Sequence, residues 1–164
     1  MKKQVIILIG LKGSGKTYIG TMLQDKIGIQ FFRVEDIWLS HKSVRVTNKY
    51  IQDGFTLVEQ EIDRLLINKN RITIESTGTT KCFIMFLERL KTKYDIKLIK
   101  VQTSPELCLT RIKSRDLSVH VPVSDDIVTQ INQDALKVDL NYDLIIDNER
   151  SSDNEILKMI QEVI

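Results

Sequence analysis

An eight-residue motif, GLKGSGKT at Gly10–Thr17, constrains the fold of this 164-residue chain more than any other feature. It matches the phosphate-binding pattern G-x-x-x-x-G-K-[ST] in full, and it directly follows the apolar run Val5–Ile9. A glycine-rich turn between a strand and a helix can point backbone N–H groups at a phosphate, and the positive end of the helix adds to the attraction. The pattern predicts that Lys16 contacts the β- and γ-phosphates of a nucleotide and that Thr17 binds Mg²⁺ through its hydroxyl.

The residues after the motif supply the helix that such a loop requires. Ile19, Leu23 and Ile27 repeat at helical spacing, and Gly28 follows as a stop signal. We therefore expect a helix from residue 16 to residue 27. The residues of the loop expected to bind the nucleotide are Gly10, Lys12, Gly13, Ser14, Gly15, Lys16 and Thr17.

Size and composition indicate one domain over residues 1–164. A hydrophobic content of 42% in 164 residues is enough for one buried core, and seven Gly and two Pro leave no low-complexity linker. A net charge of +2 lacks the strong basic bias of a dedicated nucleic-acid binder. The run Val5–Ile9 is too short to span a membrane, and Cys82 and Cys108 lack metal-type spacing. These features favour a soluble, cytoplasmic protein without a membrane partner.

Short apolar runs alternate with helical patterns along the chain, which is typical of an α/β fold with a parallel sheet. The five runs expected to form strands are Val5–Ile9, Phe31–Val34, Ile72–Ile74, Ile96–Val101 and Leu144–Ile146. Helical patterns between them predict a three-layer α/β/α arrangement with helices on both faces of the sheet. Ligands bind beyond the carboxyl ends of the strands in such sheets, so residues that follow each run are candidates for function.

Polar clusters predict the starts of three helices. Ser104 followed by Pro105 combines a hydroxyl cap with proline at the first helical position. Ser124 precedes two aspartates, and Ser152 with Glu155 has the spacing of a capping box. The capping box predicts a terminal helix that packs on the sheet.

Acidic residues follow the second and third expected strands. A carboxylate at Glu35 or Asp36 could accept the proton of an attacking hydroxyl, orient that hydroxyl, or bind Mg²⁺ through water. The same pair would favour the start of a short helix at Ile37–Ser40 through its dipole, and the sequence does not decide which carboxylate is the base. Glu75 closes the third strand, where an acidic residue is poorly placed for burial, and this favours a role near Mg²⁺.

Two arginines precede an irregular stretch of the chain. Arg111 and Arg115 lie four residues apart and therefore share one helix face. Guanidinium groups can stack on adenine or bridge transferring phosphates. We expect residues 115–123 to form a short lid, Arg111 to contact the nucleotide, and Arg115 to act in catalysis.

With these residues, the chain resembles the small P-loop kinases of metabolites, nucleosides and nucleic-acid ends from its first strand to its terminal helix. The resemblance implies ATP, Mg²⁺ and a lid that closes over the phosphates. Shikimate kinases are similar in length and around Gly28–Phe32, but their acceptor-binding residues are not matched. Arg33 and Glu35 stand at their Asp-x-Asp, Thr56 follows Phe55 where they have arginine, and their later glycine run appears only as Gly78.

The segment from Arg111 to Asp126 is more similar to the lid of polynucleotide 5′-hydroxyl kinases, and gluconate kinases share a comparable order of residues. On the polynucleotide kinase pattern, Glu35 aligns with the catalytic aspartate and Asp36 with its neighbour. The arginine that this family has shortly after the acidic pair is absent, and Trp38 stands in that region.

The function predicted from these residues is an ATP- and Mg²⁺-dependent transfer of a phosphoryl group to a hydroxyl of a small metabolite or nucleoside. A polynucleotide 5′-hydroxyl kinase and an ATP-binding interaction module without catalysis remain open as alternatives. A GTPase-like hydrolase is disfavoured because Asn48–Ile51 lacks the aspartate of a guanine-reading motif. A basic groove leading away from Glu35 would indicate nucleic acid, and a closed polar pocket would indicate a metabolite.

Overall fold

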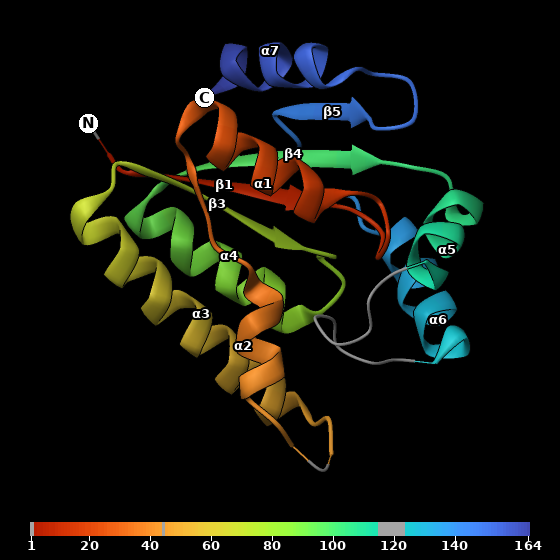
Figure 1. Cartoon of the computed structure of the whole chain (residues 1–164). Coiled ribbons are helices and arrows are strands. Elements are labelled where there is room, and N and C mark those ends of the chain that lie inside the picture. Colours follow the sequence, from red (N-terminus) through yellow and green to blue (C-terminus); the bar gives the residue numbers. More distant parts are fainter. Residues whose placement is uncertain (1, 44, 115–123) are drawn as a thin grey trace.

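A five-stranded, wholly parallel sheet lies at the centre of the computed structural model, which describes residues 2–43, 45–114 and 124–164 (Figure 1). The order of the strands across the sheet is β2-β3-β1-β4-β5. The strands are β1 (Gln4–Ile9), β2 (Gln30–Phe31), β3 (Arg71–Ser76), β4 (Asp95–Gln102) and β5 (Leu144–Asp147). The predicted α/β fold with five parallel strands is confirmed.

Helices connect consecutive strands, as parallel pairing requires. The helices in the described part of the chain are α1 (Lys16–Ile27), α2 (Val34–Ser40), α3 (Asn48–Asn68), α4 (Lys81–Lys93), α5 (Pro105–Lys113), α6 (Asp125–Leu136) and α7 (Asp153–Val163). None of these described helices is both long and apolar enough to cross a membrane. In Figure 1, α5 and α6 lie beyond the carboxyl ends of the strands, next to the loop that follows β1.

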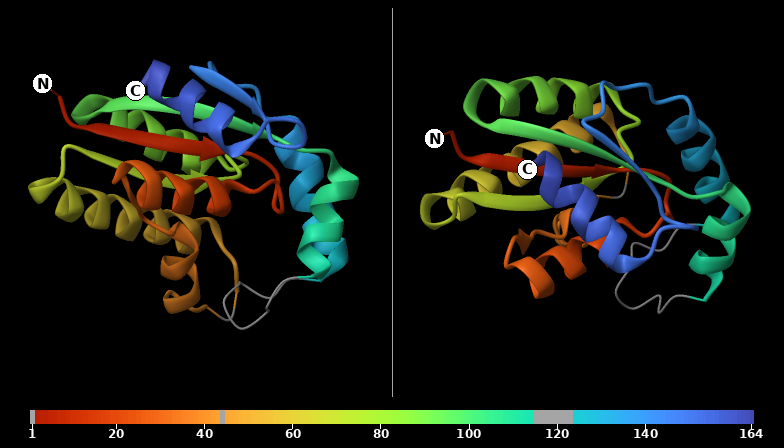
Figure 2. Two further views of the ribbon diagram at one scale, coloured as in Figure 1. Left: turned by 45° about the horizontal axis from the view of Figure 1, so that its top comes forward. Right: turned by 90° about the horizontal axis from the view of Figure 1, so that it is seen from above.

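The alternation of side chains along β1 divides the core into two halves. Figure 2 shows the helices that lie on both sides of the sheet. Val5, Ile7 and Ile9 point to one face and pack with buried residues of α3 and α4. Ile6 and Leu8 point to the other face and pack with buried residues of α1 and α7. Because both faces of the sheet are covered, β1 can be apolar from Val5 to Ile9, and this explains the unbroken run in the sequence.

The second strand is shorter than predicted, and the acidic pair lies in a helix. The prediction of a strand over Phe31–Val34 is wrong at its end, because β2 stops at Phe31 and α2 begins at Val34. Val34 is buried in the core that α3 and α4 form on the sheet, so this apolar residue belongs to a helix. Glu35 and Asp36 occupy the first turn of α2, where the helix dipole favours carboxylates.

Two of the three predicted helix caps form as expected. The Ser152 hydroxyl and the Glu155 carboxylate make the reciprocal bonds of a capping box at α7, and the Ser124 hydroxyl accepts from the backbone N–H of Ile127 at α6. The Ser104 hydroxyl makes no cap bond, so that detail is wrong. Its backbone N–H instead donates to the carboxylate of Glu149, which ties the start of α5 to the loop after β5.

Candidate active site

The loop between β1 and α1 has the geometry of an anion-binding turn. Gly13 and Gly15 have positive φ values of 93° and 98°, and α1 begins at Lys16, directly after them. The first N–H groups of a helix have no partner within it, so the start of α1 can donate to a phosphate. A Cβ at Gly13 would lie 2.5 Å from the carbonyl oxygen of Cys108 in α5. Both the backbone conformation and the contact with α5 therefore require glycine at this position.

The side chain of Lys16 folds back into the phosphate-binding loop. Its side chain is 8% exposed, and Nζ donates to the carbonyl oxygens of Gly10 (3.0 Å) and Leu11 (2.7 Å). This arrangement keeps the ammonium group in the concave side of the loop, where a phosphate would enter. An ammonium group at this position can make charge-assisted hydrogen bonds to a phosphate.

Thr17 and Glu75 contact each other across the first turn of α1. Thr17 Oγ1 donates to Glu75 Oε2 at 2.8 Å, which joins α1 to the end of β3. Adjacent oxygen ligands of an octahedral Mg²⁺ with bonds of 2.0–2.1 Å lie roughly 2.9 Å apart. The hydroxyl and the carboxylate therefore have the chemistry and the spacing of two neighbouring Mg²⁺ ligands.

Three side chains from other parts of the chain donate hydrogen bonds to the carbonyl oxygen of Ser14. It accepts hydrogen bonds from Thr103 Oγ1 (3.0 Å), Asn148 Nδ2 (2.7 Å) and Arg111 Nη1 (3.3 Å). These residues follow β4, follow β5 and lie in α5, respectively. The phosphate-binding loop is thus fixed from the carboxyl ends of two strands and from α5. Arg111 lies beside the loop, and its contact with a nucleotide stays a prediction.

A further anchor comes from α6. Asn132, which is buried, accepts from the backbone N–H of Lys12 through Oδ1 (2.7 Å) and donates through Nδ2 to the carbonyl oxygen of Lys12 (3.0 Å). The amide therefore satisfies both backbone groups of one loop residue. This pairing links the loop to a helix 120 residues later in the sequence.

The two acidic residues at the start of α2 lie in different surroundings, Glu35 beside the phosphate-binding loop and Asp36 at the surface. Glu35 Oε1 lies 3.6 Å from Lys12 Nζ, Glu35 Oε2 lies 3.2 Å from Arg33 Nη2, and the side chain is 15% exposed. Asp36 is 61% exposed and contacts Arg33 at 3.7 Å. Glu35 faces the phosphate-binding loop, and Asp36 points away from it because it lies one residue further around the helix.

A cavity of about 490 Å³ opens beside the loop and contains most of the predicted site residues. Its wall on the side of the loop includes Lys12, Gly13, Gly15, Lys16 and Thr17. Glu35 and Glu75 line the same cavity, and the opposite wall comes from α2, α3 and α4. The structure thus brings the phosphate-binding loop, the hydroxyl of Thr17 and the carboxylates of Glu75 and Glu35 around one space.

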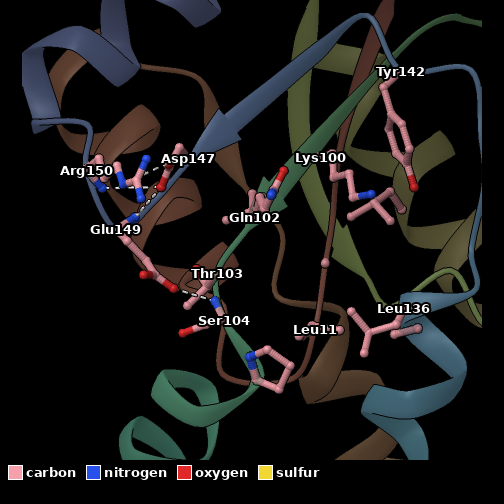
Figure 3. Close-up of a pocket in the computed structure, with 15 residues that line it drawn as sticks. Leu11, Lys100, Gln102, Thr103, Ser104, Leu136, Tyr142, Asp147, Glu149 and Arg150 are labelled. Carbon is pink, nitrogen blue, oxygen red and sulfur yellow. Dashed lines mark hydrogen bonds and ion pairs between the residues drawn. The ribbon is translucent and has the colours of Figure 1, made fainter.

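A second cavity, of about 440 Å³, lies on the other side of the start of the loop, where Gly10 and Leu11 contribute to its wall. Figure 3 shows Lys100 and Tyr142 on one side of this cavity, and Glu149 and Arg150 on the other. Lys100 Nζ lies 5.4 Å from the centre of the Tyr142 ring. The phosphate-binding loop therefore separates two cavities, and Thr17, Glu35 and Glu75 line the first.

Some predicted residues fall elsewhere. Asp36 does not line the first cavity, and Arg115, together with the expected lid at residues 115–123, lies outside the described residues. Thr103 and Asn132 were missed by the sequence reasoning. Neither belongs to a motif, and only the folded chain brings them to the loop.

Comparison with known proteins supports a kinase. No protein-family model matches the chain. A shikimate kinase of Thermodesulfovibrio yellowstonii is 24% identical over 161 residues, which cover 94% of this chain and 91% of the relative. A shikimate kinase of Azobacteroides pseudotrichonymphae is 32% identical over 87 residues, about half of each chain.

Solved structures share the fold over nearly the whole chain. A putative kinase from Chloroflexus aurantiacus has a TM-score of 0.74 at 14% identity, with 100% of both chains covered. The shikimate kinase of Acinetobacter baumannii, solved with shikimate, has a TM-score of 0.64 at 18% identity over 99% of this chain and 92% of that chain. Sequence similarity and fold together support a small P-loop kinase. The position of the P-loop, between β1 and α1 at the carboxyl end of the sheet, agrees with that result.

Proposed function

We propose that this P-loop protein is an ATP- and Mg²⁺-dependent phosphotransferase that transfers the γ-phosphoryl group to a hydroxyl of a small molecule. One observation carries the proposal: Lys16, Thr17, Glu75 and Glu35 line a single cavity. Phosphoryl transfer requires a cradle for phosphates, a divalent cation and a group that orients the attacking hydroxyl, and these residue types supply all three.

Each residue has a role that follows from its position. The N–H groups at the start of α1 and the ammonium of Lys16 would bind the β- and γ-phosphates. Thr17 and Glu75, whose oxygens lie 2.8 Å apart, would hold Mg²⁺ directly or through water. An Mg²⁺ ion held by these residues would neutralise negative charge on the phosphates during the transfer.

Glu35 is the residue proposed to act on the acceptor. Lys12 and Arg33 hold its carboxylate in place at the wall of the cavity. The acceptor oxygen attacks the γ-phosphorus, the bond to the β-phosphate oxygen breaks, ADP leaves, and the hydroxyl proton passes to Glu35. Arg111, beside the loop, is proposed to contact the nucleotide, and the catalytic role of Arg115 remains a prediction.

An acceptor screen tests the proposal. We expect ATP consumption to rise with one class of compound in a panel of polyols, sugar acids, nucleosides and 5′-hydroxyl oligonucleotides. Glu35→Gln should lower that turnover by roughly 10²- to 10⁴-fold, whereas Asp36→Asn should lower it far less. ATP binding without turnover on any acceptor would contradict the proposal and favour a nucleotide-binding module without catalysis.

A further inference from the structure

The wall of the first cavity that faces the P-loop is aromatic and aliphatic. Trp38 of α2 and Tyr50 and Phe55 of α3 line it, and Val46 and Ile131 extend the apolar surface. The ring centroids of Trp38 lie 5.9 Å from Tyr50 and 5.6 Å from Phe55, so the three rings form one continuous surface. A surface of this kind binds flat, apolar faces of a ligand in preference to charged groups.

Packing fixes the orientation of these rings. Trp38 lies so close to α3 that a Cβ at Gly54 would be 2.0 Å from its ring, which explains a glycine in the middle of a 21-residue helix. Tyr50 stacks on His41 with a centroid distance of 4.7 Å, and its hydroxyl donates to the carbonyl oxygen of His41 at 2.7 Å. Since this hydroxyl bonds to the protein, Tyr50 presents its ring to the cavity.

Apart from Glu35, the polar side chains that the described residues place beside the aromatic wall are uncharged. Ser76, Thr77, Thr79 and Thr80 line this part of the cavity, and the hydroxyls of Thr77 and Thr79 lie 3.1 Å apart. Hydroxyl groups can donate to and accept from an uncharged ligand. They cannot neutralise a carboxylate or a sulfate.

The cations are concentrated at the phosphate side. Of the described residues that line the cavity, those with positive charge are Lys12 and Lys16. Lys12 pairs with Glu35 at 3.6 Å, and Lys16 lies within the P-loop, where the nucleotide phosphates would bind. Within the described part of the cavity, an acidic acceptor on the aromatic wall would therefore place its charge against apolar rings, which is costly without a paired cation.

We propose that the acceptor is an uncharged alcohol with a flat ring, such as a nucleoside. Its ring packs on Trp38 and Tyr50, the hydroxyls of Thr77 and Thr79 bind its polar edge, and its own hydroxyl points to Glu35. This inference rests on the proposed phosphotransferase function. The proposed acceptor differs from the acceptors for which the similar shikimate kinases and gluconokinase are named, because shikimate and gluconate are acids.

Binding can be measured without turnover because Trp38 is the single tryptophan of the chain. With the donor site saturated by a non-hydrolysable ATP analogue and Mg²⁺, Trp38 fluorescence is titrated with adenosine, cytidine, uridine, shikimate and gluconate. We expect saturable quenching by at least one nucleoside, at a concentration about tenfold or more below that of either acid. Calorimetry with the same compounds confirms that the quenching reports binding.

Variants locate the binding to the aromatic wall. Tyr50→Ala should weaken nucleoside binding by about tenfold or more, and Tyr50→Phe, which keeps the ring, should weaken it much less. Ile67→Ala is the matched control, because Ile67 lies in the same helix, is 70% exposed and does not line the cavity. Val46→Arg, at a position that is 76% exposed, adds a cation at the rim and should tighten binding of the two acids.

The outcomes separate this inference from the proposed function. Tighter binding of shikimate or gluconate than of every nucleoside, or no binding by any compound, overturns the inference and leaves phosphotransfer to be judged by turnover. Nucleoside binding that Tyr50→Ala leaves unchanged also overturns it. Nucleoside binding at the aromatic wall without phosphoryl transfer supports the acceptor class and contradicts the proposed function.

Discussion

Gly13 joins the P-loop to α5, and a single methyl group at this position tests that contact. Its φ of 93° is unfavourable for alanine, and the added Cβ would lie 2.5 Å from a backbone oxygen of Cys108. We expect Gly13→Ala to destabilise the fold by about 1–3 kcal/mol and to weaken ATP binding. Chemical denaturation and nucleotide titration measure the two effects.

Gly28 provides the matched control, because it also has a positive φ, of 71°, but a Cβ there meets nothing within 4 Å. Gly28→Ala should therefore show only the cost of the left-handed conformation, about 1 kcal/mol, with ATP binding unchanged. Equal losses of ATP affinity in both variants would show that the contact with α5 does not shape the loop.

At the level of secondary-structure elements, α6 supports the P-loop through one side chain. Asn132→Ala removes both hydrogen bonds to the backbone of Lys12 and leaves these groups without their partner. We expect a loss of about 1–3 kcal/mol in stability and a higher KM for ATP. Urea unfolding and steady-state kinetics measure these changes.

Gln130→Ala is the control in the same helix, because Gln130 is exposed and bonds only weakly to Asp134 at 3.3 Å. Its effect on stability should stay within about 0.5 kcal/mol. A normal KM for ATP in the Asn132 variant would contradict the role assigned to α6.

The elements also show what the sequence can and cannot predict. The P-loop, the helix after it and the capping box at Ser152 depend on neighbouring residues, so local patterns identify them. The prediction of where β2 ends was wrong because Val34 is buried as part of a helix and not of a strand. An apolar residue alone does not distinguish the two. The bonds of Thr103 and Asn132 to the P-loop join residues 89 and 120 positions apart, which no local pattern records.

For the stability of the whole molecule, a cluster of charged side chains between α3 and α4 makes the free energy of unfolding depend on pH. Burial raises the pKa of Glu59, but hydrogen bonds from Arg89 and Lys93 outweigh this effect and the net pKa is lowered. Burial likewise raises the pKa of Asp63, and bonds from Lys93 and Tyr94 lower it overall. A lowered pKa in the folded state stabilises the protein above the ordinary carboxyl pKa of about 4, and this stabilisation is lost as the pH falls through the lowered value.

We therefore expect wild-type protein to be more stable than Glu59→Gln near pH 7, with the difference shrinking below about pH 4. Urea unfolding of both proteins across this range measures it. Glu88→Gln, which removes an exposed ion pair with Lys91, should differ little from wild type at any pH. A gap between wild type and Glu59→Gln that widens in acid would contradict the account of this cluster.

The central claim concerns the destination of the γ-phosphoryl group, and following that group measures it most directly. Wild-type protein, Lys16→Ala and Glu35→Gln are incubated with γ-labelled ATP, Mg²⁺ and the acceptor that the screen identifies, and the labelled product is separated. The account predicts label in the acceptor with wild type and a decrease of roughly 100-fold or more in each variant. Label released only as inorganic phosphate, or transfer unchanged in Lys16→Ala, would contradict it.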